Sequence, residues 1–385
     1  MRICKHLKAR FARIFLGLLL VLGFQGHLWG GSLRKVWELN LGEAIKNSGW
    51  HDIGRPGILA LRFSADGRTI ALATSPYRAG GVVLSHLILV HVLQPQKDIR
   101  EFQIENIASD SGTLGIKPPA VAWSPEGTII IAGNNLVHVV DGGICELPTG
   151  FGGGFITPDQ IVALPIRKDG SSQFKVYNSD CQLTHTWEVK GQWTFSDVSV
   201  ERGLISALRK TSREVAQPAE ELLVVDPIAE KIVQSWATSA TGYSSRFADH
   251  GKVLCVGDNG GDFADPREVP PRCMDIDGGN RIAEITNING GSPFAISENT
   301  SRVVTSDYRN VWNFIYREYD TELKRRVVWD FRKNVEIVSW SPSIQTYSLL
   351  VPRPARDPFT FAISPDGQYI AEGGNGVLRL YKIEP

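Results

Sequence analysis

Cysteine and the signatures of catalysis are scarce in this sequence. Only five of the 385 residues are Cys, no Cys-x-x-Cys pair occurs, and no Cys/His cluster has the spacing of a zinc site. Gly-x-Ser-x-Gly and His-Glu-x-x-His are missing, so no motif supports a serine-hydrolase or zincin site. The run Gly150–Phe155 lacks the last glycine of a dinucleotide loop, and we interpret it as a tight connection between strands. We therefore assign no catalytic residue and expect no cofactor.

A surplus of basic residues is also missing. The chain has 41 Lys and Arg residues and 41 Asp and Glu residues. Five of the basic residues lie within residues 1–27, which contain no acid. The rest of the chain therefore carries 36 basic groups against 41 acidic ones, a net charge of −5. Nucleic acid would require a Lys/Arg footprint for its phosphates, so we expect no nucleic-acid partner.

The apolar stretch near the N-terminus is too short to cross a bilayer. Ile14–Phe24 spans eleven residues, whereas a transmembrane helix needs about 20. Residues 1–32 instead have the order of an export signal: a basic start, an apolar middle and small residues at Gly30-Gly31-Ser32. The alternative is an uncleaved N-terminal anchor, which would be the only membrane contact. In both cases we expect residues 33–385 to be extracytoplasmic, either periplasmic or secreted.

A hairpin motif recurs along the chain. Its clearest copy is Ile363–Gly374, where Ser-Pro-Asp-Gly separates two apolar runs. Proline presets φ at the first turn residue, and Asp-Gly supplies the hydrogen bond and the positive φ that reverse the chain. Seven copies, aligned on the residue before the turn, have an average spacing of 50 residues: Ser64, Ser124, Thr157, Ser199, Ala248, Ser297 and Ser364. Self-similarity at this period indicates a propeller or a solenoid.

Each hairpin is followed by β-rich runs that complete a four-strand unit, A to D. In three copies the fourth run ends in a small hydroxyl residue and Trp, at Trp187, Trp236 and Trp340. The last copy stops after its third strand, whereas the strand-like Leu33–Leu41 precedes the first hairpin. We therefore predict an all-β fold: a seven-bladed β-propeller of four-stranded antiparallel blades. Leu33–Leu41 should complete the last blade and make residues 33–385 one closed domain.

This pattern resembles the WD40-like propeller superfamily, in the broad sense that includes the PD40 and YVTN-type repeats of bacterial exported proteins. The resemblance covers about Leu33–Ile383 and is strongest in Phe361–Ile383. It departs from strict WD40 repeats, because the Gly-His pair is missing and Trp329-Asp330 is the only Trp-Asp dipeptide. The resemblance therefore implies the fold and little about activity.

The longest irregular segments are predicted on one face of the propeller. In a four-stranded blade the A–B and C–D turns share one face, and the B–C and D–A connections share the other. The A–B turns here are short. The long segments map to the opposite face, where binding residues usually concentrate: Ser75–Val82, Asn106–Pro118, Lys210–Ala219, Gly257–Pro271, Asp307–Arg325 and Ser341–Pro358.

One of these segments, Asp307–Arg325, is rich in aromatic residues. Its candidate binding residues are Tyr308, Trp312, Phe314, Tyr316 and Tyr319. The alternate spacing of Trp312, Phe314 and Tyr316 would align them on one side of a strand. Two interpretations stay open: a local hydrophobic core that holds the segment down, or a contact platform for a protein, a glycan or a flat ligand.

A second segment, Gly257–Cys273, carries acidic residues between two cysteines. Asp258, Asp262 and Asp265 could offer oxygen ligands to calcium, but their spacing does not match a calcium-binding loop, and we assign no metal. Cys255 and Cys273 flank the segment on strands that should pair, which makes them a disulfide candidate. Cys145 and Cys181 are expected to begin neighbouring D strands whose outer positions diverge, and so to be unpaired or buried.

Three classes of function are consistent with these features, and one of them is a purely structural component of the cell envelope. The other two have a binding or catalytic role. The first is a non-enzymatic scaffold that binds a protein or an extracellular ligand through the B–C/D–A face. The second is a propeller enzyme, either a lactonase-like hydrolase or a quinoprotein-type oxidoreductase, with its site at the central channel on that face. Converging charged residues at the channel mouth would favour the enzyme. An aromatic patch around Trp312 without such charges would favour binding.

Overall fold

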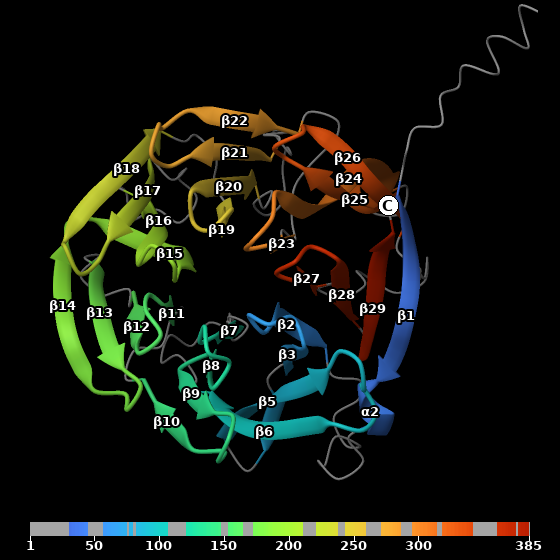
Figure 1. Ribbon diagram of the computed structural model, residues 1–385, viewed down its shortest axis with the longest axis horizontal. Helices are drawn as coiled ribbons and strands as arrows, with labels where there is room; N and C mark the ends of the chain where they lie inside the picture. The colour runs from blue at the N-terminus through green and yellow to red at the C-terminus, as the bar shows by residue number, and fades with distance from the viewer. Residues whose placement is uncertain are drawn as a thin grey trace, which may run out of the picture.

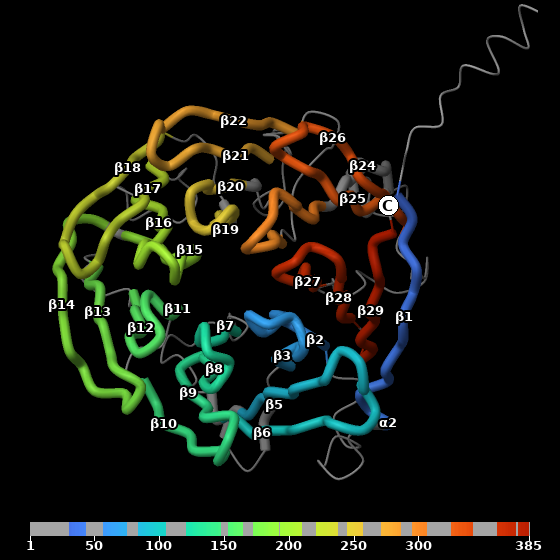
Figure 2. Tube along the Cα trace, in the orientation of Figure 1, coloured from blue at the N-terminus to red at the C-terminus, as the bar shows by residue number. Residues whose placement is uncertain are grey.

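The described part of the chain forms a ring of seven antiparallel β-sheets around a central opening (Figure 1). Figure 2 shows that the chain follows the ring from β2 (Ile58–Phe63) round to β29 (Val377–Glu384) and that the N-terminal strand β1 (Ser32–Asn40) lies beside β29 in the last sheet. The predicted seven-bladed β-propeller is therefore confirmed. The computed structural model describes residues 31–44, 57–74, 77–79, 82–106, 121–147, 153–164, 172–210, 221–237, 243–258, 271–285, 295–313, 318–341, 360–374 and 376–384.

The first four blades, numbered in chain order, follow one another without interruption. Blade 1 contains β2 (Ile58–Phe63), β3 (Thr69–Thr74), β4 (Tyr77–Ala79), β5 (Val82–His91) and β6 (Ile99–Asn106). Blade 2 contains β7 (Val121–Trp123), β8 (Ile129–Ala132), β9 (Asn135–His138) and β10 (Ile144–Glu146). Blade 3 contains β11 (Gly153–Phe155), β12 (Gln160–Ala163), β13 (Ser172–Asn178) and β14 (Leu183–Val189). Blade 4 contains β15 (Gln192–Ser199), β16 (Leu204–Lys210), β17 (Glu221–Asp226) and β18 (Lys231–Ala237).

The last three blades include the strand that closes the ring. Blade 5 contains β19 (Tyr243–Ala248), β20 (Val253–Asp258), β21 (Arg272–Asp275) and β22 (Arg281–Glu284). Blade 6 contains β23 (Ala295–Ile296), β24 (Arg302–Asn313), β25 (Glu318–Asp330) and β26 (Val335–Trp340). Blade 7 contains β27 (Thr360–Ile363), β28 (Tyr369–Gly374), β29 (Val377–Glu384) and the outer strand β1 (Ser32–Asn40). A single helical turn, α2 (Leu41–Ala44), follows β1.

Blade 1 departs from the four-strand pattern. Its fifth strand, β4, pairs with the start of β5 and lies in the segment predicted as a B–C loop. That part of the prediction is wrong, because the hairpin continues past Thr74 before the chain reverses. No helix among the described residues is long and apolar enough to cross a membrane.

The A–B turns hold the inner hairpins together by the predicted chemistry. The Ser64 hydroxyl donates to Asp66 at 2.6 Å and accepts the Thr69 backbone N–H at 3.0 Å. Gly67 takes a φ of 70°, which favours glycine. Blade 7 repeats this arrangement, with Ser364 donating to Asp366 at 2.6 Å. The four-residue turn motif therefore sets the geometry of the A–B turn in blades 1 and 7.

The hydrophobic core consists of seven clusters, and each lies between two neighbouring blades. Blades 7 and 1, for example, share a cluster that includes Leu39, Ile58, Ile70 and Leu380. The D-strand tryptophans cover the outer side of four clusters: Trp37, Trp187, Trp236 and Trp340. The Ser/Thr-Trp signature therefore marks the residue that seals an interface between blades.

The N-terminal strand closes the ring as predicted. β1 pairs antiparallel with β29 from Ser32–Glu384 through Asn40–Val377. The Trp37 indole N–H donates to the Val92 carbonyl of blade 1 at 2.7 Å. Arg379 donates to Glu38 at 3.0 Å across the same pair of strands. β1 thus belongs to blade 7 and also contacts blade 1.

The glycine-rich run at 150–155 is not only a connection. Gly153–Phe155 forms β11, the inner strand of blade 3, which corrects the interpretation from the sequence. A Cβ on Gly154 would lie 2.3 Å from a methyl carbon of Val198 in blade 4. Glycine is therefore required here because two inner strands approach closely.

We predict that Trp37→Ala lowers the free energy of unfolding by about 2–4 kcal/mol, because it removes indole packing and a hydrogen bond at the closure. Urea denaturation measures this change. Val36→Ala is the matched control on the same strand, where the side chain is 39% exposed, and it should change stability by less than about 0.5 kcal/mol. Equal effects of the two substitutions would show that β1 is not held by Trp37.

The Glu38–Arg379 pair should make stability depend on pH. The hydrogen bond from Arg379 lowers the pKa of Glu38 below its ordinary 4.5, although burial opposes the shift and Lys35 adds to it. A lowered folded-state pKa stabilises the fold above the ordinary value and loses that contribution as pH falls through the folded pKa. We expect wild type to exceed Glu38→Gln in stability at neutral pH and to converge with it in acid. A difference that stays constant down to about pH 2 would refute the linkage; exposed Glu43→Gln is the control.

Candidate functional site

The aromatic segment of blade 6 forms a two-stranded arm rather than an irregular loop. β24 and β25 pair from Arg302–Asp330 to Asn313–Glu318, with one irregularity in register between Asp307 and Tyr308, which corrects the loop prediction for this segment. Among the described residues, β23 pairs with β24 only at Val303 and Val304. The outer strand β26 pairs with β25 only over Arg326–Asp330. The hairpin therefore continues past its neighbours on the B–C/D–A face.

The register of the arm brings three of the predicted aromatic positions to one face. Trp312 pairs with Tyr319, and Tyr308 pairs with Leu323. Residues directly opposite each other share a face of an antiparallel pair, and so do alternate residues of one strand. Positions 308, 312 and 319 therefore share one face, which we call the aromatic face. Phe314 and Tyr316 lie outside the described residues.

The other face of the arm is predominantly acidic. The pairs that occupy it are Arg309–Glu322, Val311–Asp320 and Asn313–Glu318. The arm is therefore two-sided in sequence, with Tyr and Trp on one face and carboxylates on the other. Among the described residues, neither neighbouring strand pairs with this part of the arm, so no pairing recorded in the blade requires the division.

A cluster of charged residues occurs at the opposite end of the channel, near the A–B turns. Arg62 of blade 1 contacts Glu298 of blade 6 at 2.5 Å and so spans the inner strand of blade 7. Asp197 of blade 4 lies 3.7 Å from Arg246 of blade 5 and accepts the Phe247 backbone N–H at 2.8 Å. These four residues, Arg62, Asp197, Arg246 and Glu298, form the channel cluster.

The pKa values show that the members of the channel cluster interact. Burial raises the pKa of Asp197, although Arg246 and Arg62 oppose the shift. Burial would lower the pKa of Arg62, but Glu298 and Asp197 outweigh it and the pKa is raised. Burial lowers the pKa of Arg246, with Asp197 opposing. Two cations and two anions thus balance one another, and the cluster lies on the A–B side rather than on the face predicted for an enzyme site.

No motif in the sequence pointed to the channel cluster, but a repeat signal was present. Arg62, Asp197 and Arg246 all stand two positions before the residue that aligns the seven hairpins. The equivalent residues of the other blades are Ala122, Phe155, Ala295 and Ala362. A charge at a position that is otherwise apolar could have been found by comparing the repeats with one another.

A second charged group is buried between blades 6 and 7. Arg326 contacts Glu372 at 2.7 Å, and their side chains are 0% and 2% exposed. The guanidinium also lies 5.0 Å from the ring centre of Phe361. The Tyr381 hydroxyl donates to Glu372 at 3.3 Å, and burial, together with Glu372, raises the pKa of Tyr381 to about 12. Because no ligand can reach this group, we interpret it as part of the interface between blades.

A polar cavity of about 220 Å³ lies between blades 1 and 2 on the A–B/C–D face. Its lining includes Asp66, His91, Arg100, Trp123 and Glu126. Charges of both signs surround it, and Arg100 donates to the Val139 carbonyl at 3.1 Å. The cavity could admit a small polar molecule. Because its lining carries charges of both signs, it does not favour one class of ligand over another.

Cys255 and Cys273 form a disulfide inside blade 5. They occupy opposite positions on β20 and β21 and are 0% and 1% exposed. Of the calcium candidates, Asp258 ends β20, whereas Asp262 and Asp265 lie outside the described residues. Within the described ranges, no three His, Cys, Asp or Glu residues gather in a way that could hold a metal ion.

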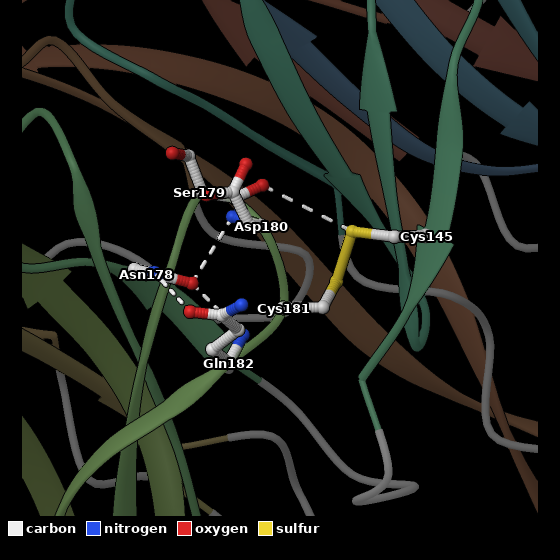
Figure 3. The surroundings of a disulfide bond; sticks show 6 residues. All are labelled: Cys145, Asn178, Ser179, Asp180, Cys181 and Gln182. Carbon is white, nitrogen blue, oxygen red and sulfur yellow. Dashed lines mark hydrogen bonds between the residues drawn. A yellow bond between two sulfur atoms is a disulfide. The ribbon is translucent and has the colours of Figure 1, made fainter.

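Cys145 and Cys181 also form a disulfide (Figure 3). The expectation that they stay unpaired is wrong, because Cys181 precedes its D strand and lies in the C–D turn of blade 3. Asn178 shapes this turn by accepting the backbone N–H groups of Asp180 and Gln182 at 3.1 and 2.8 Å. Cys181 itself takes a φ of 60° and so meets Cys145 on β10 of blade 2.

Comparison with known proteins supports the fold. No protein family matches the sequence, and no curated protein is significantly similar to it. Among solved structures, the chain is similar to one in a crystal structure of the mitotic checkpoint complex, with a TM-score of 0.56. The alignment covers 91% of this chain and 92% of the other at 10% identity. The fold is that of a seven-bladed β-propeller. At this identity the likeness concerns architecture alone.

The two ion pairs described above should differ sharply in their contribution to stability. We predict that Glu372→Gln lowers the free energy of unfolding by about 3–5 kcal/mol, because it leaves Arg326 charged and buried. Glu298→Gln is the matched substitution in a pair whose side chains are 28% and 50% exposed, and it should cost less than about 1 kcal/mol. Chemical denaturation of both variants tests this ranking, and a larger effect at Glu298 would reverse it.

Proposed function

We propose that this protein is an extracytoplasmic interaction scaffold that binds a partner protein through the B–C/D–A face of its propeller. The observation that carries the proposal is the arm formed by β24 and β25. Among the described residues it extends past the pairing of its flanking strands, and its backbone register, with positions 308, 312 and 319 on the same face, supports the proposal. Tyrosine and tryptophan are the residues that contribute most to protein interfaces.

Three further observations support the scaffold. The WD40-like fold is a common platform for protein interactions, and the similar solved structure is a protein complex. Disulfides persist in oxidising compartments, so the two disulfides are consistent with an extracytoplasmic location. The charges of the channel cluster neutralise one another and lie at the other end of the channel. The export segment at residues 1–32 lies almost entirely outside the described residues and is proposed from its sequence.

Replacing the aromatic face should abolish partner capture without weakening the fold. We expect Trp312→Ala with Tyr319→Ala to reduce recovery of the partner more than tenfold in cross-linking pull-downs, since interface hot spots contribute about 2 kcal/mol or more each. The matched control is Val311→Ala with Asp320→Ala, a pair one position away on the other face of the same arm. It should leave recovery unchanged.

Thermal unfolding of the variants separates binding from folding. Unchanged melting with lost capture supports the proposal. Equal capture by both double variants would overturn it, and so would loss of capture only in the control. A photoreactive residue introduced at position 312 should cross-link the partner, whereas one at position 311 should not.

A further inference from the structure

The two disulfides occupy contrasting environments. Cys255–Cys273 is buried within one sheet, where no reductant can approach it. Cys145 and Cys181 are only half-buried. Their neighbours face solvent: Ile144 is 46% exposed and Leu183 is 53% exposed. Thiol–disulfide exchange requires direct access to a sulfur atom, so the two bonds should differ greatly in reactivity.

The accessible disulfide joins elements of different blades. Cys145 lies on β10, the outer strand of blade 2, and Cys181 lies in the C–D turn of blade 3. Among the described residues, β10 is attached to its own sheet by three residue pairs, Ile144–Val137, Cys145–Leu136 and Glu146–Asn135, and by one backbone hydrogen bond just beyond each end of the strand. The disulfide is therefore a substantial part of what fixes β10 along the outer side of the ring.

The residues around this disulfide can accommodate the two cysteines in their reduced, thiol form. The Cys145 sulfur lies 4.0 Å from the Ser179 carbonyl oxygen (Figure 3), so a thiol there could donate to that oxygen. The Asn178 side chain holds the turn by hydrogen bonds that do not involve sulfur. The core between blades 2 and 3 includes Leu136, Leu147, Phe155 and Tyr177, all buried, and the two half-buried cysteines pack against its edge. Breaking the bond should therefore loosen β10 and leave the fold intact.

We infer that Cys145–Cys181 is a reversible thiol–disulfide exchange site that controls how firmly blade 2 is attached to blade 3. The co-reactant is a dithiol reductant. One of its thiolates attacks a sulfur of the pair, forms a mixed disulfide and releases the other cysteine as a thiolate, which takes up a proton. The second thiol of the reductant then displaces the remaining cysteine. The protein gains two thiols and the dithiol becomes a disulfide, so two electrons and two protons are transferred.

Differential alkylation of the folded, full-length protein tests this assignment. The protein is equilibrated with increasing dithiothreitol, alkylated with N-ethylmaleimide and mapped by mass spectrometry. We expect Cys145 and Cys181 to be labelled together at about tenfold lower reductant than Cys255 and Cys273, or at a still larger ratio. Simultaneous labelling of all four cysteines would overturn the inference. So would resistance of both pairs until the protein unfolds, or free thiols at Cys145 and Cys181 before any reductant is added.

Hydrogen exchange then tests the structural consequence. Reduction should speed amide exchange at least tenfold in residues 144–146, while exchange in β20 and β21 stays unchanged. Reoxidation should restore the slow rate. Cys145→Ser with Cys181→Ser should reproduce the reduced pattern, and Cys255→Ser with Cys273→Ser serves as the control. If the first double variant does not fold, the wild-type reduction series still decides, since unchanged exchange in residues 144–146 after selective reduction would exclude the proposed loosening.

Discussion

The pairing of β1 with β29 is the interaction on which the rest of this structure depends. A propeller blade buries its two sheet faces against its neighbours, so a ring that is not closed leaves two blades with an exposed apolar face. Here the two ends of the described chain close the ring in one sheet. Trp37 extends the contact to blade 1, and Arg379 and Glu38 join the two strands electrostatically. The closure therefore joins the last blade to the N-terminal strand and to blade 1.

Closure also explains where the core lies. All seven hydrophobic clusters lie between blades, so no blade has a core of its own. The blades should unfold as a cooperative ring rather than one at a time, unless local attachments are weak. Blade 2 has the shortest set of described strands, of three or four residues each. The disulfide from Cys145 to blade 3 compensates for the short outer strand.

The repetitive part of the structure can be predicted from the sequence, and the exceptions to the repeat cannot. The Ser-x-Asp-Gly turns and the D-strand Trp residues have a local physical cause, so the seven hairpins and the closing strand are evident. Cys145 and Cys181 cannot be paired from the sequence, because their contact depends on a left-handed residue in a turn, at Cys181. From the sequence, the glycines around Gly154 are interpreted as a connection between strands. Glycine is required there because Val198 approaches closely, and Val198 belongs to another blade, so the local sequence does not reveal the reason. The sequence predicts a loop insertion at the arm, because its two strands pair with each other beyond the length that the repeat predicts for a blade.

The departures from the repeat indicate where function resides. Residues that pack the blades against one another recur from blade to blade, because the interfaces between neighbouring blades have similar geometry. The arm of β24 and β25 occurs in blade 6, and its aromatic face is not required by the pairing of the blade. The channel cluster also departs from the repeat, but its charges are paired with one another and leave little to recognise a ligand. The aromatic face is therefore the stronger candidate for contact with another molecule, and it lies on the side of the ring opposite the short turns.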